Sequence, residues 1–226
     1  MLMVKALVWD FDGLIMDSED ADCSAWREEF EAAGVAITVA EYADWWLRWA
    51  LRRQVPMLDR LVERAGRGID TQAVSRRRQA RYYQLCADLP ARPGVVAWLE
   101  RAQVLGLQCA LAANDGTGRV LAHLDRLGLT SGFEVVVTAH RMAPKPAPDL
   151  YLTALERLGV AAGEVVAIED SPHGVAAAKA AGLWVVAVPN QVSATLDLTA
   201  ADVIVANLHT VSLEEVLAAL PPSAAR

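Results

Sequence analysis

Six short runs of apolar, largely β-branched residues constrain the fold of this chain more than any other feature. They lie at residues 4–10, 107–114, 133–139, 164–170, 183–189 and 202–207. Each run is apolar nearly throughout instead of alternating, which is typical of strands buried on both faces of a parallel sheet. From residue 94 onward, helical patterns separate the runs and end at Gly128, Gly159 and Gly182. The alternation predicts an α/β fold with a Rossmann-like, doubly wound parallel sheet.

Residues 17–89 interrupt this alternation. They contain no convincing strand and show helical patterns over 19–33, 39–54, 55–65 and 71–87. The first strand is therefore followed by a helical insert instead of a single crossover helix, and "LPARPG" at 89–94 is typical of a return linker. We predict a core formed by residues 1–16 and 90–226, with an inserted α-helical cap domain at 17–89.

Composition excludes several classes of function. The net charge of −7, without a dominant basic stripe, argues against nucleic-acid binding. No apolar run approaches the roughly 18 residues of a membrane span, and Lys5 and Asp10 interrupt any secretory signal. Cys23, Cys86 and Cys109 lack metal-ligand spacing and favour free thiols in a reducing compartment. We expect a cytoplasmic protein without nucleic-acid or membrane partners, either a monomer or a weak homodimer.

Polar residues follow four of the predicted strands. Asp10 and Asp12 end the first run, and Lys145 lies in the loop after the third. The second run ends in Asn114, Asp115, Gly116 and Thr117, and the fourth ends in Glu169, Asp170 and Ser171. Ligands of open parallel sheets bind at the carboxyl ends of the strands, so we expect these side chains to meet.

The chemistry of such a set is restricted. Four carboxylates at short range cannot all ionise without a compensating charge, and Mg²⁺ prefers their oxygens. Mg²⁺ together with Lys145 suits a phosphoryl group, whose charge must be neutralised before an anion can approach. Asp10 could then attack phosphorus, while Asp12 protonates the leaving oxygen and later deprotonates a water. Gly13 would let the backbone amides approach the phosphate.

Three segments resemble motifs of one family. "DFDGLIMDSE" at 10–19, "KPAPDLYLTALERLG" at 145–159 and "IEDSPHGVAAAKAAG" at 168–182 are similar to the first, third and fourth motifs of the haloacid dehalogenase-like hydrolase superfamily. Within it, the chain resembles the β-phosphoglucomutase-like and phosphoglycolate phosphatase-like members of subfamily IA. The resemblance implies a Rossmann-like core with a small helical cap inserted after the first motif.

The resemblance also implies the roles of the site residues. Asp10 is the expected nucleophile that forms an aspartyl-phosphate, and Asp12 is the expected general acid and base. Lys145 would stabilise the nucleophile and the phosphate. Asp170, with Glu169, would hold Mg²⁺ beside the Asp10 carboxylate and the main-chain carbonyl of Asp12.

One position departs from the family pattern. The second motif normally carries Ser or Thr at the end of its strand, where this chain has Ala113, followed by Asn114. Losing one charge-assisted hydrogen bond would cost about 1.5–3 kcal/mol of phosphate affinity, unless Thr117 replaces it. We expect the phosphate to be bound by Gly13, Asn114, Asp115 and Lys145.

The choice among family members rests on two observations. Dehalogenases and phosphonatase-like members lack an acid at the position of Asp12, so phosphoryl transfer is favoured. Sugar phosphomutases of this type carry a histidine in the first cap helix, whereas the histidines of this chain lie outside residues 17–89. We predict a Mg²⁺-dependent phosphomonoester hydrolase acting on a small phosphorylated metabolite. A sugar phosphomutase and a catalytically weak phosphate-binding regulatory protein remain the alternatives. Sugar phosphates, phosphoglycolate-like acids and nucleotides all remain open as substrates.

Overall fold

The chain forms two compact units. The computed structural model describes residues 4–50, 56–66, 68–140 and 142–221. The core unit contains Met1–Met16, Pro90–Asn190 and Asp197–Arg226, and the helical unit contains Asp17–Leu89 and Gln191–Leu196. The units divide after residues 16 and 89, and residues 191–196 belong to the helical unit. That the helical unit serves as a cap stays a prediction.

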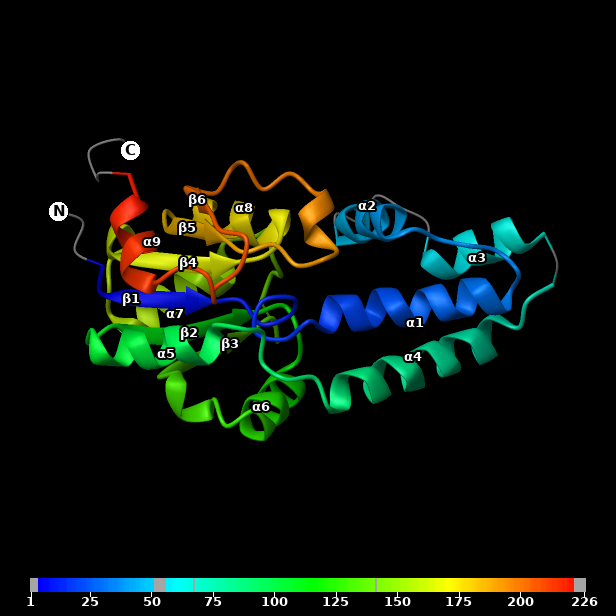
Figure 1. Cartoon of the computed structure of the whole chain (residues 1–226), viewed down its shortest axis with the longest axis horizontal. Helices are drawn as coiled ribbons and strands as arrows, with labels where there is room; N and C mark the ends of the chain where they lie inside the picture. Colours follow the sequence, from blue (N-terminus) through cyan, green and yellow to red (C-terminus); the bar gives the residue numbers. More distant parts are fainter. Residues whose placement is uncertain (1–3, 51–55, 67, 141, 222–226) are drawn as a thin grey trace. The chain divides into compact units, whose positions relative to one another are not determined.

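The core unit is built on a parallel sheet. Within the described residues it has six strands in the order β3-β2-β1-β4-β5-β6, and every neighbouring pair is parallel. Figure 1 shows β1, in blue, between β2 and β4. The predicted fold class is confirmed. The strands are β1 Ala6–Trp9, β2 Gln108–Ala113, β3 Val135–Thr138, β4 Val165–Glu169, β5 Trp184–Ala187 and β6 Val203–Ile204.

Both faces of the sheet are covered, which explains why its strands are apolar without alternation. Ala6 and Val8 of β1 pack into a cluster with side chains of α7 (Asp149–Leu158) and α8 (Pro172–Ala180). The ring of Trp9 instead lies edge-on to that of Trp98 in α5 (Val95–Val104), with the ring centroids 6.3 Å apart. All four residues of β1 are fully buried. The helices of the core unit are α5 Val95–Val104, α6 Thr117–Arg126, α7 Asp149–Leu158, α8 Pro172–Ala180 and α9 Leu213–Ala219.

The order of the strands determines where a ligand can bind. The chain proceeds from β1 to β2 and β3 on one side, and then crosses to β4 on the other side of β1. Strand order therefore reverses at β1, and the carboxyl ends next to such a switch form a natural crevice. The polar residues that follow β1, β2 and β4 lie at this edge of the sheet.

Among the described residues, the helical unit contains four α-helices with their own core. They are α1 Ser18–Ala32, α2 Val39–Ala50, α3 Met57–Ala65 and α4 Thr71–Ala87. The bounds of α1 and α4 agree closely with the predicted patterns, whereas the predicted 39–54 runs into residues outside those described. Phe30, Tyr42 and Leu61 are fully buried in this core.

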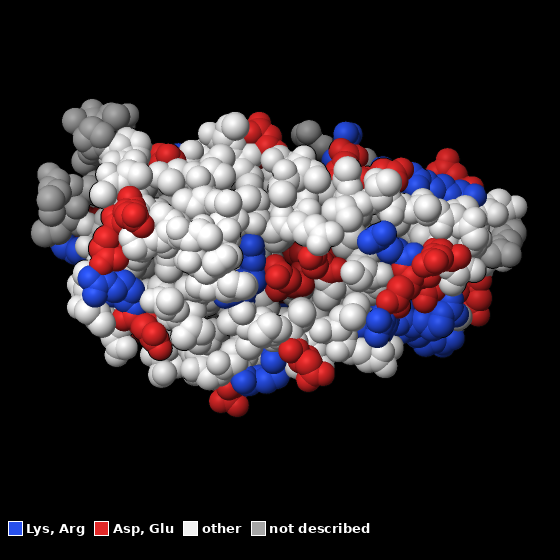
Figure 2. All heavy atoms as spheres, viewed as in Figure 1, with Lys and Arg blue, Asp and Glu red and all other residues white. Residues whose placement is uncertain are grey.

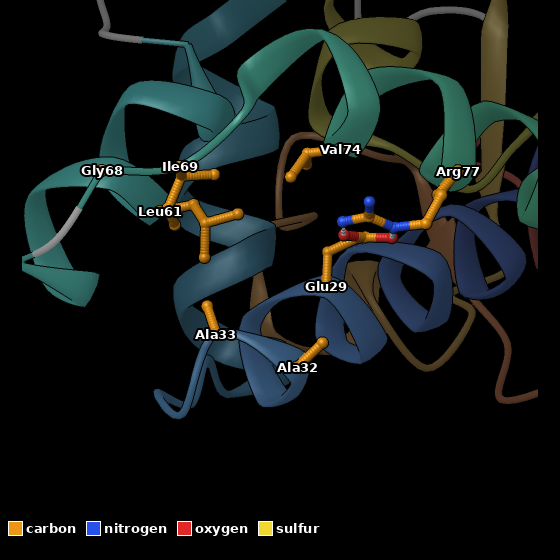
Figure 3. Close-up of a pocket in the computed structure, with 8 residues that line it drawn as sticks. All are labelled: Glu29, Ala32, Ala33, Leu61, Gly68, Ile69, Val74 and Arg77. Atoms are coloured by element: carbon orange, nitrogen blue, oxygen red, sulfur yellow. Dashed lines mark hydrogen bonds and ion pairs between the residues drawn. The ribbon is translucent and has the colours of Figure 1, made fainter.

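Ion pairs join α1 and α4. Arg77 binds both carboxylate oxygens of Glu29, and Arg81 binds Glu28. On the face shown in Figure 2, red and blue side chains lie next to one another over these helices. The Glu29–Arg77 pair also borders a hollow of about 250 Å³, whose other walls include Leu61, Ile69 and Val74 (Figure 3).

Arg78 contacts aromatic rings as well as a carboxylate. Its guanidinium lies over the rings of Trp26 and Tyr82, at 5.3 and 5.4 Å from their centroids, and pairs with Asp22. Asp22 in turn accepts a hydrogen bond from Tyr42 at 2.6 Å. The guanidinium of Arg78 therefore joins α4 to α1.

Two further observations bear on the class of protein. Among the described residues, no helix has both the length and the apolar composition that a membrane crossing requires.

The three cysteines are buried and are not joined by a disulfide, and burial raises the pKa of Cys23 to about 11 and that of Cys109 to about 12. These two thiols are therefore protonated and unreactive near neutral pH.

The glycines at the two ends of α5 give a test of the packing. Gly94 has φ +92°, and a Cβ there would lie 2.4 Å from the carbonyl carbon of Leu208. Gly106 has φ +69°, but a Cβ there would meet no described heavy atom within 4 Å. We expect Gly106→Ala to cost about 1 kcal/mol of unfolding free energy from backbone strain alone. Gly94→Ala should cost at least about 2 kcal/mol more, because the backbone of Leu208 must move. Urea unfolding of both variants measures the difference, and equal losses would contradict the predicted collision.

Candidate active site

The loop after β1 places two aspartates at the edge of the sheet. The N–H of Asp10 donates to the carbonyl of Ile168 at 3.0 Å, so pairing with β4 continues to this residue. Beyond it the chain turns tightly, because Gly13 has φ +80° and its N–H donates to the carbonyl of Met16 at 2.9 Å. A left-handed conformation of this kind favours glycine. The turn leaves Asp10 buried and Asp12 partly exposed.

Three buried carboxylates meet next to one ammonium group. Asp10, Glu169 and Asp170 offer oxygens that all lie within 4.8 Å of one another. Lys145 reaches them from the loop before α7, with its Nζ 2.5 Å from Asp10 Oδ1 and 2.6 Å from Glu169 Oε1. Four residues from three segments, which are the loop after β1, the loop before α7 and the end of β4, are thus brought together.

The electrostatics of this cluster indicate a shortage of positive charge. Burial raises the pKa of Asp10 well above its ordinary value, and the Glu169 and Asp170 carboxylates raise it further against the opposing effect of Lys145. Burial alone would lower the pKa of Lys145, but Asp10 and Glu169 overcome this and raise it, so the amine stays protonated. Three acids share one ammonium group, and their oxygens are the donors that a hard divalent cation prefers. The residues therefore fit such an ion.

Glu169 is enclosed by donors. Its Oε1 also accepts a hydrogen bond from the Tyr151 hydroxyl, and its Oε2 accepts from the N–H of Asp170 at 3.2 Å and from Ser171 Oγ at 3.4 Å. The ring of Tyr151 lies under Lys145, with Nζ 5.0 Å from the ring centroid. Tyr151 was not predicted as a site residue, because an aromatic residue on an amphipathic helix usually indicates only core packing.

A second network fixes Asp170. Asn190 Nδ2 donates to Asp170 Oδ2 at 2.7 Å and to the carbonyl of Gly13 at 3.3 Å. Arg92 donates to the same carbonyl at 2.5 Å and to that of Pro189 at 2.9 Å. The loop after β1 and the loop after β5 are thereby tied together. Neither Arg92 nor Asn190 was predicted as a site residue, because Arg92 lies in the return linker at 89–94 and Asn190 lies beyond the run at 183–189.

Asn114 contacts the backbone of Lys145. Its Oδ1 accepts from the N–H of Lys145 at 2.8 Å, and its Nδ2 donates to the carbonyl of the same residue at 3.5 Å. Thr117 Oγ1 lies 2.6 Å from Thr138 Oγ1 at the end of β3. Phosphate binding by Asn114, or by Thr117 in place of the hydroxyl missing at Ala113, stays a prediction.

Asp12 and Asp115 share a partner. Asp115 accepts hydrogen bonds from the N–H of Gly116 at 2.6 Å and from Arg119 Nε, and Arg119 Nη2 donates to Asp12 Oδ1. Among the described residues, the side chain of Asp12 is outside the three-carboxylate group. Its expected role in holding a metal through its main-chain carbonyl, and that of Asp115 in binding phosphate, stay predictions.

The space around Glu169 leads to a testable prediction. A Cβ at Gly174 of α8 would lie 1.9 Å from the carboxyl carbon of Glu169, which is fully buried and cannot turn toward solvent. We expect Gly174→Ala to lower the free energy of unfolding by about 2 kcal/mol through overpacking, measured by urea unfolding with EDTA.

The matched control is Gly118→Ala in α6, where a Cβ would meet no described heavy atom within 4 Å. There the helix propensity of alanine should leave stability unchanged or raise it by up to about 1 kcal/mol. Equal effects of the two variants would show that Glu169 does not occupy the space beside Gly174.

The raised pKa of Asp10 predicts a dependence of stability on pH. Because its pKa is higher in the folded than in the unfolded state, Asp10 contributes stability at low pH that is lost as the pH rises above about 4. We expect Asp10→Asn to gain stability relative to the wild type between pH 4.5 and 7.5, measured by unfolding in EDTA. If the unfolding free energy of Asp10→Asn minus that of the wild type stayed constant or fell as the pH rose over this range, the raised pKa would be contradicted.

Comparison with known proteins agrees with this geometry. The family model of the haloacid dehalogenase-like hydrolases matches residues 4–182. YhcW of Bacillus subtilis is 38% identical over 195 residues, which cover 86% of this chain and 87% of YhcW. The phosphorylated carbohydrates phosphatase of Thermotoga maritima is 31% identical over 182 residues, covering 80% of this chain and 82% of that protein.

A solved structure shares the fold over nearly the whole chain. The crystal structure of CbbY from Rhodobacter sphaeroides in complex with phosphate superposes with a TM-score of 0.66 at 26% identity, covering 92% of this chain and 96% of that one. The family model and the relatives, together with the convergence of Asp10, Lys145 and Asp170, lead to one assignment. The chain belongs to the haloacid dehalogenase-like hydrolases.

Proposed function

We propose that this protein is a phosphatase that hydrolyses a small phosphorylated metabolite through an aspartyl-phosphate on Asp10, with Mg²⁺ as its cofactor. The observation that carries the proposal is the convergence of Asp10, Lys145 and Asp170 at the switch point of the sheet. The relative from Thermotoga maritima is itself named a phosphatase.

The first half of the reaction transfers the phosphoryl group to the protein. An oxygen of the Asp10 carboxylate forms a bond to phosphorus while the bond between phosphorus and the ester oxygen breaks. Asp12 gives its proton to the departing oxygen, so that an alcohol leaves. Lys145 Nζ, 2.5 Å from Asp10 Oδ1, helps to orient the nucleophile and offers a positive charge to the phosphoryl oxygens.

The second half releases phosphate. Asp12, now a carboxylate, takes a proton from a water whose oxygen attacks phosphorus, and the bond to Asp10 breaks to regenerate the free carboxylate. One group can serve as acid and then as base because each half returns it to the state that the other half requires.

The expected ligands of the cation are the carboxylates of Asp10, Asp170 and Glu169 and the main-chain carbonyl of Asp12. Mg²⁺ bound there would supply the positive charge that the three acids and the phosphate require. Backbone amides after Gly13, together with Lys145 and Asn114, are the proposed contacts of the phosphate oxygens.

A phosphorylated carbohydrate is the proposed substrate, because the Thermotoga maritima relative is named for such substrates. We also propose that the protein is cytoplasmic and is a monomer or a weak homodimer. A panel of sugar phosphates, phosphoglycolate and nucleotides, ranked by kcat/KM, identifies the preferred class. Appearance of an isomeric sugar phosphate instead of inorganic phosphate would favour the mutase alternative.

Hydrolysis of p-nitrophenyl phosphate tests the mechanism directly. EDTA should abolish turnover, and excess Mg²⁺ should restore it. Asp10→Asn should lower kcat by at least about 10³-fold, because the amide cannot attack phosphorus. The control is Asp125→Asn, an exposed substitution on α6 that should leave turnover unchanged. Turnover that resists EDTA, or that survives in Asp10→Asn, would refute the proposal.

A further inference from the structure

The guanidinium of Arg119 joins the two acids that lie outside the carboxylate cluster. Its Nη2 donates to Asp12 Oδ1 and its Nε donates to Asp115 Oδ2, and the three side chains are 20%, 27% and 33% exposed respectively. Arg119 lies in the first turns of α6, four residues after Asp115. An arginine fork can hold two carboxylates in defined directions, which a lysine cannot do.

Arg119 is itself oriented by its surroundings. Asp115 is held in place because it also accepts from the N–H of Gly116 at 2.6 Å, at the start of α6. Thr117 ties the same end of the helix to β3 through the hydroxyl of Thr138, 2.6 Å away. The direction of the guanidinium toward Asp12 is therefore set by the end of β2 and the start of α6.

A neighbouring contact joins the same two segments. The ring centroids of Phe11 and His123 lie 6.3 Å apart. Phe11 and its neighbour Asp12 in the loop after β1 thus contact His123 and Arg119, which lie one turn apart on α6. Burial lowers the pKa of His123, and the charges of Arg119 and Arg126 lower it further. His123 is therefore neutral near pH 7, and the charge that this turn of α6 presents to Asp12 is that of Arg119.

Asp12 benefits from such a partner more than Asp10 does. Asp10 is buried against Lys145, whereas Asp12 lies on a partly exposed loop where its carboxyl group could rotate. Proton transfer requires the acid to be held within hydrogen-bond reach of the reacting oxygen. A guanidinium N–H can donate to a carboxyl oxygen whether or not the acid carries its proton, so the contact can persist through both halves of the reaction.

We propose that Arg119 is a positioning residue, which orients Asp12 for proton delivery to the leaving oxygen and is itself oriented by Asp115. The proposal rests on the proposed phosphatase function, because it assigns a partner to the acid of that reaction. It also gives Asp115 a role that differs from direct phosphate binding.

How much a reaction needs proton donation depends on the leaving group. Comparing two leaving groups therefore distinguishes an effect of Arg119 on the position of Asp12 from an effect on the stability of the fold. p-Nitrophenolate is a weak base and leaves without a proton, whereas phenolate is a stronger base and needs one. The two aryl phosphates otherwise offer the protein nearly the same shape. The ratio of their kcat/KM values therefore reports on the acid, since kcat/KM covers the steps up to release of the phenol.

The decisive experiment compares wild type and Arg119→Gln with p-nitrophenyl phosphate and phenyl phosphate. We expect kcat/KM for phenyl phosphate to fall about tenfold more than that for p-nitrophenyl phosphate, a fraction of the full contribution of a general acid. Asp12→Asn is the reference for complete loss of the acid and should shift the ratio further in the same direction. Arg119→Lys, which keeps the charge without the fork, and Asp115→Asn should give intermediate shifts.

Arg126→Gln, at the other end of α6, is the matched control and should leave the ratio unchanged. Thermal unfolding of each variant separates misfolding from mispositioning. Equal losses on both substrates, or a relative gain on phenyl phosphate, would overturn the role of Arg119. Absence of hydrolysis of either ester by the wild type would instead overturn the proposed function, so the two failures are distinguishable.

Discussion

The buried ion pair of Lys145 with Asp10 and Glu169 is the interaction on which the rest of the site depends. Moving an unpaired charge from water into a protein interior costs several kcal/mol, so none of these three groups could be buried alone. Together they satisfy one another, and Tyr151 adds a donor to Glu169 and a ring face to the ammonium. Because Lys145 lies in the loop after β3, Asp10 follows β1 and Glu169 ends β4, these contacts also join three segments at one edge of the sheet.

Even with Lys145, the cluster has more negative than positive charge. This excess of negative charge suits the binding of a cation. Three carboxylates face one ammonium group, and burial, together with the charges of Glu169 and Asp170, raises the pKa of Asp10. A site built only for stability would pair its charges fully. A site prepared for a cation and a phosphoryl group must instead hold acids close together before those ligands arrive. The donors around Asp170 and Glu169, including Asn190, supply the rigidity that this requires.

The fold and the centre of the site were predictable for a simple physical reason. Strands buried on both faces must be apolar throughout, so an acid at the end of such a run is conspicuous, as at Asp10 and Asp170. In a parallel sheet all of these ends lie at one edge, and their proximity follows without coordinates. The surrounding residues gave no comparable signal. Arg119 occupies an ordinary position on an amphipathic helix, and its contact with Asp12 spans 107 positions of sequence.

The sequence by itself determined the succession of strands and helices along the chain, the position of the helical segment and the polar residues at the strand ends. Apolar patterning and strand ends are local properties. Only the tertiary structure decided how each side chain is used. It placed Asn114 against the backbone of Lys145, Asp115 on Arg119 and Gly174 against Glu169. Hydrogen bonds and close packing between distant segments depend on differences in distance of a few tenths of an ångström. Such differences produce no periodic pattern in the sequence.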